Sequence, residues 1–312
     1  MPEVLLTIAA FVIAAAGAGI AFNADKRVRS LRTRLERLRV RFDRAEGELL
    51  RTRQTLAASQ VREALRANGR EATLPIEFRS QYGEDVLLWD VFGPSLEGFF
   101  IEVGAYDGVA LSVTRALEAA GWTGLLIEAL PERAAQCARN RPNSRVEHAA
   151  LGKPGGPATV TFSAVEHATP GMDMLSHIDA PDATTEHKET IEREGARTKS
   201  VTVPMTTMDA LLAKAPPSRI DAVVIDVEGA EASLLAGFDL KKWRPRVIVI
   251  EDNTMGEDDR VASIVRAGGY TECGWVGVNR VFVRTDETGL IERVRASCAS
   301  LAWPNVAFRF GR

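Results

Sequence analysis

The most restrictive feature of the sequence is a pair of apolar runs, the first ending in a glycine-rich turn and the second in an acid. The first run and its turn occupy residues 99–108 (FFIEVGAYDG), and the second reads Leu125-Leu126-Ile127-Glu128. Glycine lets a chain turn sharply beside a ligand at the carboxyl edge of a parallel sheet. An acid at the tip of the next strand accepts hydrogen bonds from ribose hydroxyls in this geometry. The two runs therefore predict an α/β sheet with a nucleoside site at its first turn.

The composition of the turn favours a cationic nucleoside over a dinucleotide. Dinucleotide loops read G-x-G-x-x-G, whereas here only Gly104 and Gly108 are present, with Asp107 between them. A carboxylate at that place would repel a pyrophosphate. S-adenosylmethionine, which carries a sulfonium cation on an adenosine, is the predicted ligand. The alternative is a structural βα turn without a ligand.

The N-terminal segment predicts a membrane anchor. Residues 4–24 contain no charged side chain, and a helix of about twenty apolar residues matches the hydrocarbon thickness of a bilayer. Only Met1-Pro2-Glu3 precedes this run, and basic residues follow it, so the positive-inside rule predicts a single-pass membrane protein whose catalytic domain is cytoplasmic. The anchor is assigned to residues 1–25. A cleaved signal peptide is the alternative, although a signal peptide begins with basic residues and this chain has the acidic Glu3 there.

A basic helical stalk is predicted over residues 26–66. Residues 26–53 hold eleven Lys/Arg and four acids, a net charge of +7; because the whole chain carries −3, the remainder carries −10. An acidic body argues against a nucleic-acid partner. Apolar residues recur at steps of three and four through residues 28–56, which predicts either a coiled coil that forms a homodimer or an amphipathic helix on anionic lipid.

The rest of the chain predicts one α/β domain. A linker is expected at residues 67–77, and the domain at residues 78–312. Helices are expected at residues 84–92, 110–120, 131–139, 207–214, 230–236 and 257–267. Strands are expected at residues 99–103, 124–128, 145–148, 158–163, 200–204, 221–226, 246–251, 270–275 and 280–284. This alternation predicts a Rossmann-like, mostly parallel sheet with helices on both faces.

Two segments depart from that alternation. The last two strands flank Gly277-Val278-Asn279 and read as an antiparallel hairpin, an ending typical of class I methyltransferase sheets. Residues 164–199 form a long polar insertion, which contains His167, His177 and His187. A loop of this length is usually functional or disordered, so a substrate-covering lid is expected, with a histidine metal site as a weaker alternative.

Several acids follow the predicted strands and should meet at one sheet edge. Ligands of open α/β sheets bind at the carboxyl ends of the strands, so Asp226, Glu228, Glu251 and Asp252 are expected beside Glu102 and Glu128. Clustered carboxylates need a cation or a proton among them. A divalent cation that activates a substrate hydroxyl and a carboxylate that acts as general base are both consistent with this pattern.

Several short motifs of this chain resemble those of the FkbM family of methyltransferases in their order and spacing. The likeness covers roughly residues 78–285 and rests on motifs at residues 80–85 (SQYGED), 100–108, 127–129, 149–152, 208–209, 225–231 and 250–251. It implies a class I, S-adenosylmethionine-dependent fold, commonly an O-methyltransferase acting on sugars, polyketides or glycans. This chain departs from the family where Tyr106 replaces a frequent Asn, and where residues 112–114 read Ser-Val-Thr instead of Ser-Asn-Thr.

The resemblance also implies roles for individual residues. Gly104 and Gly108 would approach the methionine part of the cofactor, Glu128 the ribose, and His148-Ala149 the adenine edge. The full set expected to bind the cofactor is Glu102, Gly104, Tyr106, Asp107, Gly108, Glu128, Ala129, His148 and Ala149. Asp226, Glu228 and Glu251 are the expected catalytic residues. Asp226 with Asp252 and Asn253 resembles the metal ligands of catechol-type O-methyltransferases, which implies Mg²⁺ or another divalent cation.

The functional hypothesis is a membrane-anchored O-methyltransferase that uses S-adenosylmethionine and a sugar, glycan or lipid-linked acceptor at the cytosolic face. A non-catalytic, membrane-anchored scaffold with a degenerate methyltransferase fold is the alternative. A nicotinamide-dependent oxidoreductase is disfavoured by the missing middle glycine of the turn.

Overall fold

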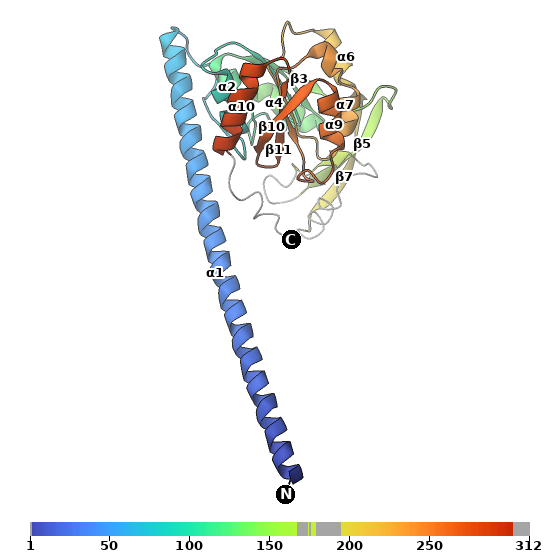
Figure 1. Ribbon diagram of the computed structural model, residues 1–312. Helices are drawn as coiled ribbons and strands as arrows, with labels where there is room; N and C mark the ends of the chain where they lie inside the picture. The colour runs from blue at the N-terminus through green and yellow to red at the C-terminus, as the bar shows by residue number, and fades with distance from the viewer. Residues whose placement is uncertain (1, 167–173, 175, 179–194, 302–312) are drawn as a thin grey trace. The chain divides into compact units, whose positions relative to one another are not determined.

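The computed structural model describes residues 2–166, 174, 176–178 and 195–301, with residues 2–26 described by their backbone alone. The chain divides into two compact units, Met1–Thr52 and Arg53–Arg312. Helix α1 (Pro2–Ala67) begins in the first unit and ends in the second, and Figure 1 shows it as one long helix. The predicted stalk is therefore helical. Its coiled coil stays a prediction, as do the proposed domain boundaries.

The prediction of a membrane anchor is corrected by the structure. Within the described part of the chain, no helix combines the length and the apolar character needed to cross a membrane. The absence of such a helix from the described residues contradicts the expectation of a single-pass membrane protein.

The second unit contains a seven-stranded sheet in the order β10-β11-β9-β8-β1-β2-β3. Its strands are β1 (Phe99–Val103), β2 (Thr123–Glu128), β3 (Arg145–His148), β8 (Ala222–Ile225), β9 (Val247–Glu251), β10 (Tyr270–Val276) and β11 (Asn279–Arg284). The five strands from β3 to β9 are parallel, and β11 is antiparallel to both β9 and β10. The predicted hairpin is confirmed, and its second strand lies inside the sheet while β10 forms the edge.

Helices cover both faces of this sheet, as predicted. They are α2 (Glu84–Phe92), α3 (Arg115–Ala120), α4 (Pro131–Asn140), α6 (Met208–Lys214), α7 (Glu231–Ala236), α8 (Leu240–Trp243), α9 (Arg260–Ala267) and α10 (Thr288–Leu301). In Figure 1, α2 and α10 lie on one side of the sheet, and α7 and α9 lie on the other. The sequence analysis did not predict α8 and α10.

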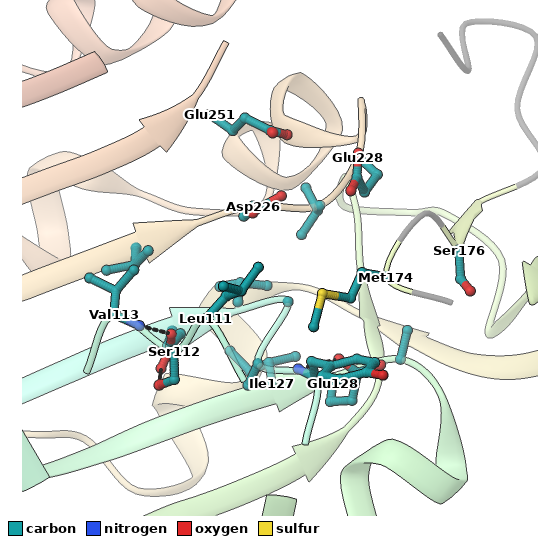
Figure 2. Close-up of a pocket in the computed structure, with 18 of the residues that line it drawn as sticks. Leu111, Ser112, Val113, Ile127, Glu128, Met174, Ser176, Asp226, Glu228 and Glu251 are labelled. Atoms are coloured by element: carbon teal, nitrogen blue, oxygen red, sulfur yellow. Dashed lines mark hydrogen bonds between the residues drawn. The ribbon is translucent and has the colours of Figure 1, made fainter. Parts of the chain in front are cut away.

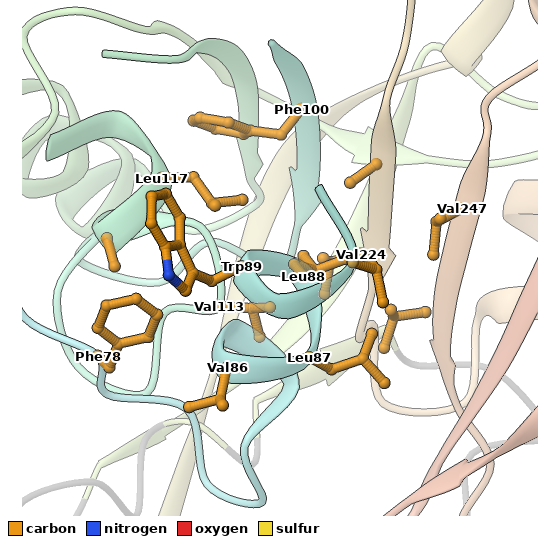
Figure 3. Close-up of a cluster of buried hydrophobic side chains, with 14 of the residues drawn as sticks. Phe78, Val86, Leu87, Leu88, Trp89, Phe100, Val113, Leu117, Val224 and Val247 are labelled. Carbon is orange, nitrogen blue, oxygen red and sulfur yellow. The ribbon is translucent and has the colours of Figure 1, made fainter. Parts of the chain in front are cut away.

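Two hydrophobic cores follow from the alternation of side chains along the strands. Phe100, Leu126 and Val224 pack on one face against α2, α3, α10 and the end of α1. Figure 3 shows this core around α2, with Leu87, Leu88 and Trp89 among the packed side chains. Ile101, Leu125 and Val223, one position along each strand, pack on the other face against α6 to α9. Because the central strands are buried on both faces, they read as continuous apolar runs.

A second, four-stranded sheet has the order β4-β7-β5-β6. Its strands are β4 (Ala150–Leu151), β5 (Thr159–Glu166), β6 (His177–Ile178) and β7 (Arg197–Thr206). Strands β5 and β7 correspond to the predicted strands 158–163 and 200–204, but they pair with each other antiparallel and do not join the main sheet. Most of the insertion, including His167 and His187, lies outside the described residues, whereas His177 lies on β6.

Helix α3 begins five residues later than predicted because residues 108–114 form a loop that is held by buried charges. Arg141 follows the end of α4 and is completely buried. Its guanidinium pairs with Glu118 of α3 at 2.6 Å and with Glu102 of β1 at 3.5 Å. It also donates hydrogen bonds to three oxygens of the loop: the Gly108 carbonyl, Ser112 Oγ and Thr114 Oγ1. One buried side chain therefore connects two helices, a strand and a loop.

We expect Arg141→Met to lower the free energy of unfolding by about 3–5 kcal/mol, because methionine fills similar space but leaves two buried carboxylates without a counter-charge. Urea unfolding measures this loss. Arg139→Met is the matched control, since Arg139 is exposed on the same helix and its replacement should change stability by less than about 0.5 kcal/mol. A loss below about 1 kcal/mol for Arg141→Met would contradict the idea that the buried Arg141 stabilises this part of the fold.

Candidate active site

The carboxyl ends of β1, β2, β8 and β9 surround a single pocket. Figure 2 shows Glu128 on one side of it and Asp226, Glu228 and Glu251 on the other, with Met174 projecting between them. The lining also includes Gly104, Tyr106, Ala129 and Ala149. The structure therefore brings together most of the residues that the sequence analysis assigned to binding and catalysis.

Glu128 ends β2, and its carboxylate is held in place by backbone groups. One oxygen accepts a hydrogen bond from the Tyr106 amide, and the other accepts one from the Leu130 amide, both at 2.8 Å. Each carboxylate oxygen has a second lone pair for a ligand hydroxyl. Burial raises the pKa of Glu128 to about 7, and the backbone hydrogen bonds act against this rise. The side chain is thus preoriented toward the pocket as a ribose site requires.

Three non-glycine residues at the pocket have positive φ. They are Tyr106 (φ 48°), Leu111 (φ 55°) and Glu228 (φ 53°). Such conformations cost free energy and persist where the surrounding structure enforces them. The Arg133 guanidinium lies 4.2 Å from the centre of the Tyr106 ring, and the Tyr106 amide binds Glu128. Backbone strain therefore gathers at the same place as the carboxylates.

The two glycines of the turn are required by packing within the protein. At Gly104, which has φ +83°, a Cβ atom would overlap the backbone carbonyl oxygen of Asp226 on the adjacent strand. At Gly108 a Cβ atom would lie 2.7 Å from Arg141 Cγ and 2.9 Å from Cys137 Sγ. Gly104 lines the pocket and lets the ends of β1 and β8 approach closely. Gly108 instead accommodates the buried arginine.

Three other predicted cofactor residues have structural contacts. Glu102 accepts hydrogen bonds from the loop that precedes α3, through Ser112 Oγ, the Val113 amide and Thr114 Oγ1. The Asp107 carboxylate accepts hydrogen bonds from two amides of its own turn, those of residues 109 and 110. The exposed His148 lies outside the pocket lining, with its Nε2 2.9 Å from the Ala129 carbonyl oxygen. Of these three residues, only Glu102 lines the pocket.

Asp226, Glu228 and Glu251 form a tight acidic cluster. Each offers a carboxylate oxygen that lies within 4.8 Å of the others. Removal from solvent and the neighbouring charges raise the pKa of all three, that of Glu228 to about 9 and that of Glu251 to about 11. A hydrogen bond from Glu251 favours the charged form of Asp226, which is accessible from the pocket. The arrangement places the accessible Asp226 beside two carboxyls whose pKa values are strongly raised.

The predicted metal set of Asp226, Asp252 and Asn253 is not assembled. Asp252 pairs with Arg280 at 2.7 Å and accepts two hydrogen bonds from Thr254, so its carboxylate is already engaged. Neither Asp252 nor Asn253 lines the pocket. The sequence places them one and two residues beyond the strand end, but the turn directs the chain away from the cavity. Among the described residues, Glu228 and Glu251 accompany Asp226 instead.

The sequence analysis missed a wall of the pocket. Gln81, Tyr82 and Glu84 line it, together with Val278 and Asn279 from the β10–β11 turn. The first three belong to the motif at residues 80–85, which the resemblance identified without a role for it. Asn279 was interpreted only as a turn residue. The lining also includes the exposed Leu111 and, from the inserted region, Phe162, Met174 and Ser176.

A parallel sheet with one inserted antiparallel strand and a carboxylate-rich pocket at its edge defines a methyltransferase-type α/β domain. Residues 102–272 match the family model described as the methyltransferase FkbM domain. Because this match covers more than half of the chain, the protein belongs to the FkbM methyltransferase family, and the resemblance noted in the sequence is confirmed. The family uses S-adenosylmethionine as methyl donor. Among curated proteins, no match is found.

Solved structures of methyltransferases show weaker similarity. A TehB-like SAM-dependent methyltransferase from Corynebacterium glutamicum is 13% identical, with a TM-score of 0.35 over 72% of this chain and 95% of that one. An O-methyltransferase from Bacillus cereus in complex with SAH is 14% identical, with a TM-score of 0.32 over 73% and 88%. The family match, and not these similarities, identifies the chain.

The acidic cluster predicts that the ligand-free protein loses stability as the pH rises. A carboxyl whose folded-state pKa is raised contributes stability below its unfolded-state pKa, and that contribution is lost as the pH approaches the folded value. For Glu251 this window extends from about pH 4.5 toward about pH 11. We expect Glu251→Gln, which is neutral at every pH, to match the wild type near pH 5 and to unfold at a higher temperature at pH 9. The difference should reach at least about 2–4 °C.

Thermal unfolding across this pH range measures the effect. The exposed Glu97 provides the control, because Glu97→Gln should leave the pH dependence of the wild type unchanged. Parallel pH curves for Glu251→Gln and the wild type would show that the cluster does not hold a proton in the folded state.

Proposed function

We propose that this protein transfers a methyl group from S-adenosylmethionine to a hydroxyl of a sugar or glycan acceptor. The observation that carries the proposal is the position of the Glu128 carboxylate and the Asp226 cluster on opposite sides of one pocket in an FkbM-family domain. On this proposal, residues 78–312 supply the catalytic domain. A scaffold without activity would have no use for three carboxyls held this close together at the sheet edge.

The residues present fit the methyl donor. Two backbone amides hold Glu128 with lone pairs available for ribose hydroxyls, and the pocket is rich in acids that favour a sulfonium cation. Tyr106, Ala129 and Ala149 would line the rest of the nucleoside site. When bound, S-adenosylmethionine supplies an electrophilic methyl group attached to a positively charged sulfur.

Asp226 is the proposed general base. Its carboxyl is accessible from the pocket, and a raised pKa, caused mainly by desolvation and opposed in part by the hydrogen bond from Glu251, suits a proton acceptor. It would accept the proton of the acceptor hydroxyl while the oxygen–carbon bond forms and the sulfur–carbon bond breaks. Glu228 and Glu251 would hold the neighbouring protons and so confine the negative charge to Asp226.

A divalent cation among Asp226, Glu228 and Glu251 is the alternative arrangement. Three carboxylate oxygens suit Mg²⁺ or Mn²⁺, and a bound cation would replace the protons that the raised pKa values indicate. Turnover that survives chelation with EDTA would favour the general base, whereas turnover restored only by added Mg²⁺ would favour the cation.

Replacing Glu128 tests the cofactor site. We expect Glu128→Ala to weaken binding of S-adenosylmethionine and S-adenosylhomocysteine by about 1.5–3 kcal/mol, because it removes charged hydrogen bonds to the ribose. Isothermal titration calorimetry measures both affinities. Glu132→Ala, at an exposed position on α4, should leave them unchanged. Equal affinities for Glu128→Ala and the wild type would contradict the ribose assignment, and no binding to the wild type would favour the scaffold.

Replacing Asp226 tests the chemistry separately from binding. Asn preserves the shape and the backbone carbonyl that contacts Gly104, so Asp226→Asn should bind S-adenosylhomocysteine within about threefold of the wild type. Its turnover should fall by at least about 10²-fold, the lower range for loss of a general base. Release of S-adenosylhomocysteine in the presence of acceptor measures the rate. A near-normal rate would exclude Asp226 as the base.

A further inference from the structure

The motif at residues 80–85 forms a rigid turn over the pocket. The Asp85 carboxylate accepts hydrogen bonds from Ser80 Oγ at 2.5 Å and from the Ser80 amide at 2.8 Å. Gly83, with φ 99°, makes the turn into α2. The buried Asp85 thereby fixes the backbone that presents Gln81 and Tyr82. A turn held by its own buried side chain gives these two residues a defined position.

The same motif is joined to the β10–β11 turn. The buried Glu84 accepts a hydrogen bond from Asn279 Nδ2 at 2.6 Å and another from the Tyr82 amide at 3.0 Å. The Tyr82 ring packs against Gly277 so closely that a Cβ atom there would overlap it. Segments about 195 residues apart in the chain therefore form one continuous wall.

The strand order places this wall at the end of the pocket away from the nucleoside site. Asn279 is the register partner of Glu251, at the β9–β11 side of the sheet. Glu128 lies on β2, and β1 and β8 separate it from β9. Asp226, at the end of β8, lies between the two. A donor bound at Glu128 thus leaves the wall for the molecule that receives the methyl group.

The charges of the pocket indicate which acceptor fits. Among the described residues that line it, none is Lys, Arg or His, whereas six are Glu or Asp. An anionic group bound at this wall would have no cationic side chain beside it and would face Glu84 and the Asp226 cluster, which is unfavourable in a partly desolvated site. By contrast, the exposed Gln81 amide can both donate and accept hydrogen bonds, and Tyr82 offers part of a ring surface.

We propose that Gln81, Tyr82, Glu84 and Asn279 form the acceptor subsite, and that it accepts an uncharged glycoside and rejects an anionic one. This inference rests on the proposed methyl transfer. Gln81 and Tyr82 contact the acceptor, while Glu84 and Asn279 are positioning residues that hold the wall together. The subsite determines specificity and is separate from the residues assigned to the donor.

Matched acceptor probes test the subsite. The full-length protein is supplied with S-adenosylmethionine and methyl hexopyranosides, the corresponding methyl hexuronosides, or the corresponding 6-phosphates, and release of S-adenosylhomocysteine is measured. We expect kcat/KM for the uncharged glycosides to exceed that for both anionic series by at least tenfold. Preference for an anionic series overturns the proposal. So does the absence of turnover with every probe when S-adenosylhomocysteine binds normally.

Substitutions at Gln81 and Tyr82 test whether these two residues bind the acceptor. Gln81→Ala and Tyr82→Ala should raise KM for the uncharged glycoside at least fivefold and leave the Kd for S-adenosylhomocysteine unchanged. Gln81→Lys should raise kcat/KM for the hexuronoside at least tenfold, whereas the matched Gln81→Glu should not. A changed Kd with an unchanged acceptor KM overturns the subsite. Failure of the wild type to bind S-adenosylhomocysteine is a separate result, which overturns the proposed function itself.

Discussion

The buried guanidinium of Arg141 is the interaction on which the geometry of the site depends. It neutralises Glu118 and Glu102 while its remaining donors bind the loop between the first glycine turn and α3. A buried charge is tolerated only when it is paired and fully hydrogen-bonded, so the position of each partner is tightly constrained. This constraint fixes the end of β1 and the loop that contributes Leu111, Ser112 and Val113 to the pocket. The part of the pocket formed by this loop is built on it.

The acidic cluster of Asp226, Glu228 and Glu251 follows from close approach of two strand ends. Gly104 allows β1 to reach the carbonyl of Asp226, and the parallel order then brings Glu251 of β9 beside Asp226. Three carboxyls so near one another cannot all ionise at neutral pH without a cation. The raised pKa values of Glu228 and Glu251 follow from desolvation and from this proximity. Such perturbation in a pocket is typical of functional sites.

The sequence predicted the elements of the main sheet well because their signals are local. Apolar runs bounded by turns located β1, β2, β8 and β9, and the helix α2 was predicted with its observed bounds. The predicted start of α3, at residue 110, was wrong. Residues 110–114 have a helical sequence pattern, but hydrogen bonds to Glu102 and Arg141 hold them as a loop. The separate antiparallel sheet that β5 and β7 form was not predicted, because pairing between strands depends on long-range contacts. The prediction that Asp252 belongs to the site was wrong for the same reason. Asp252 forms an ion pair with Arg280, and the sequence does not reveal this contact between separate segments.

By itself, the sequence determined the class of fold, the FkbM family and the acids expected at the sheet edge, because strand periodicity, turn glycines and motif spacing are properties of short segments. The tertiary structure decided which of these acids face the same cavity. It placed Glu228 and Glu251 beside Asp226, turned Glu102 toward Arg141, and brought the motif at residues 80–85 against Asn279. It also showed that the two turn glycines serve packing between strands and helices. The physical reason is that a side chain's role depends on neighbours that only folding brings within hydrogen-bonding distance.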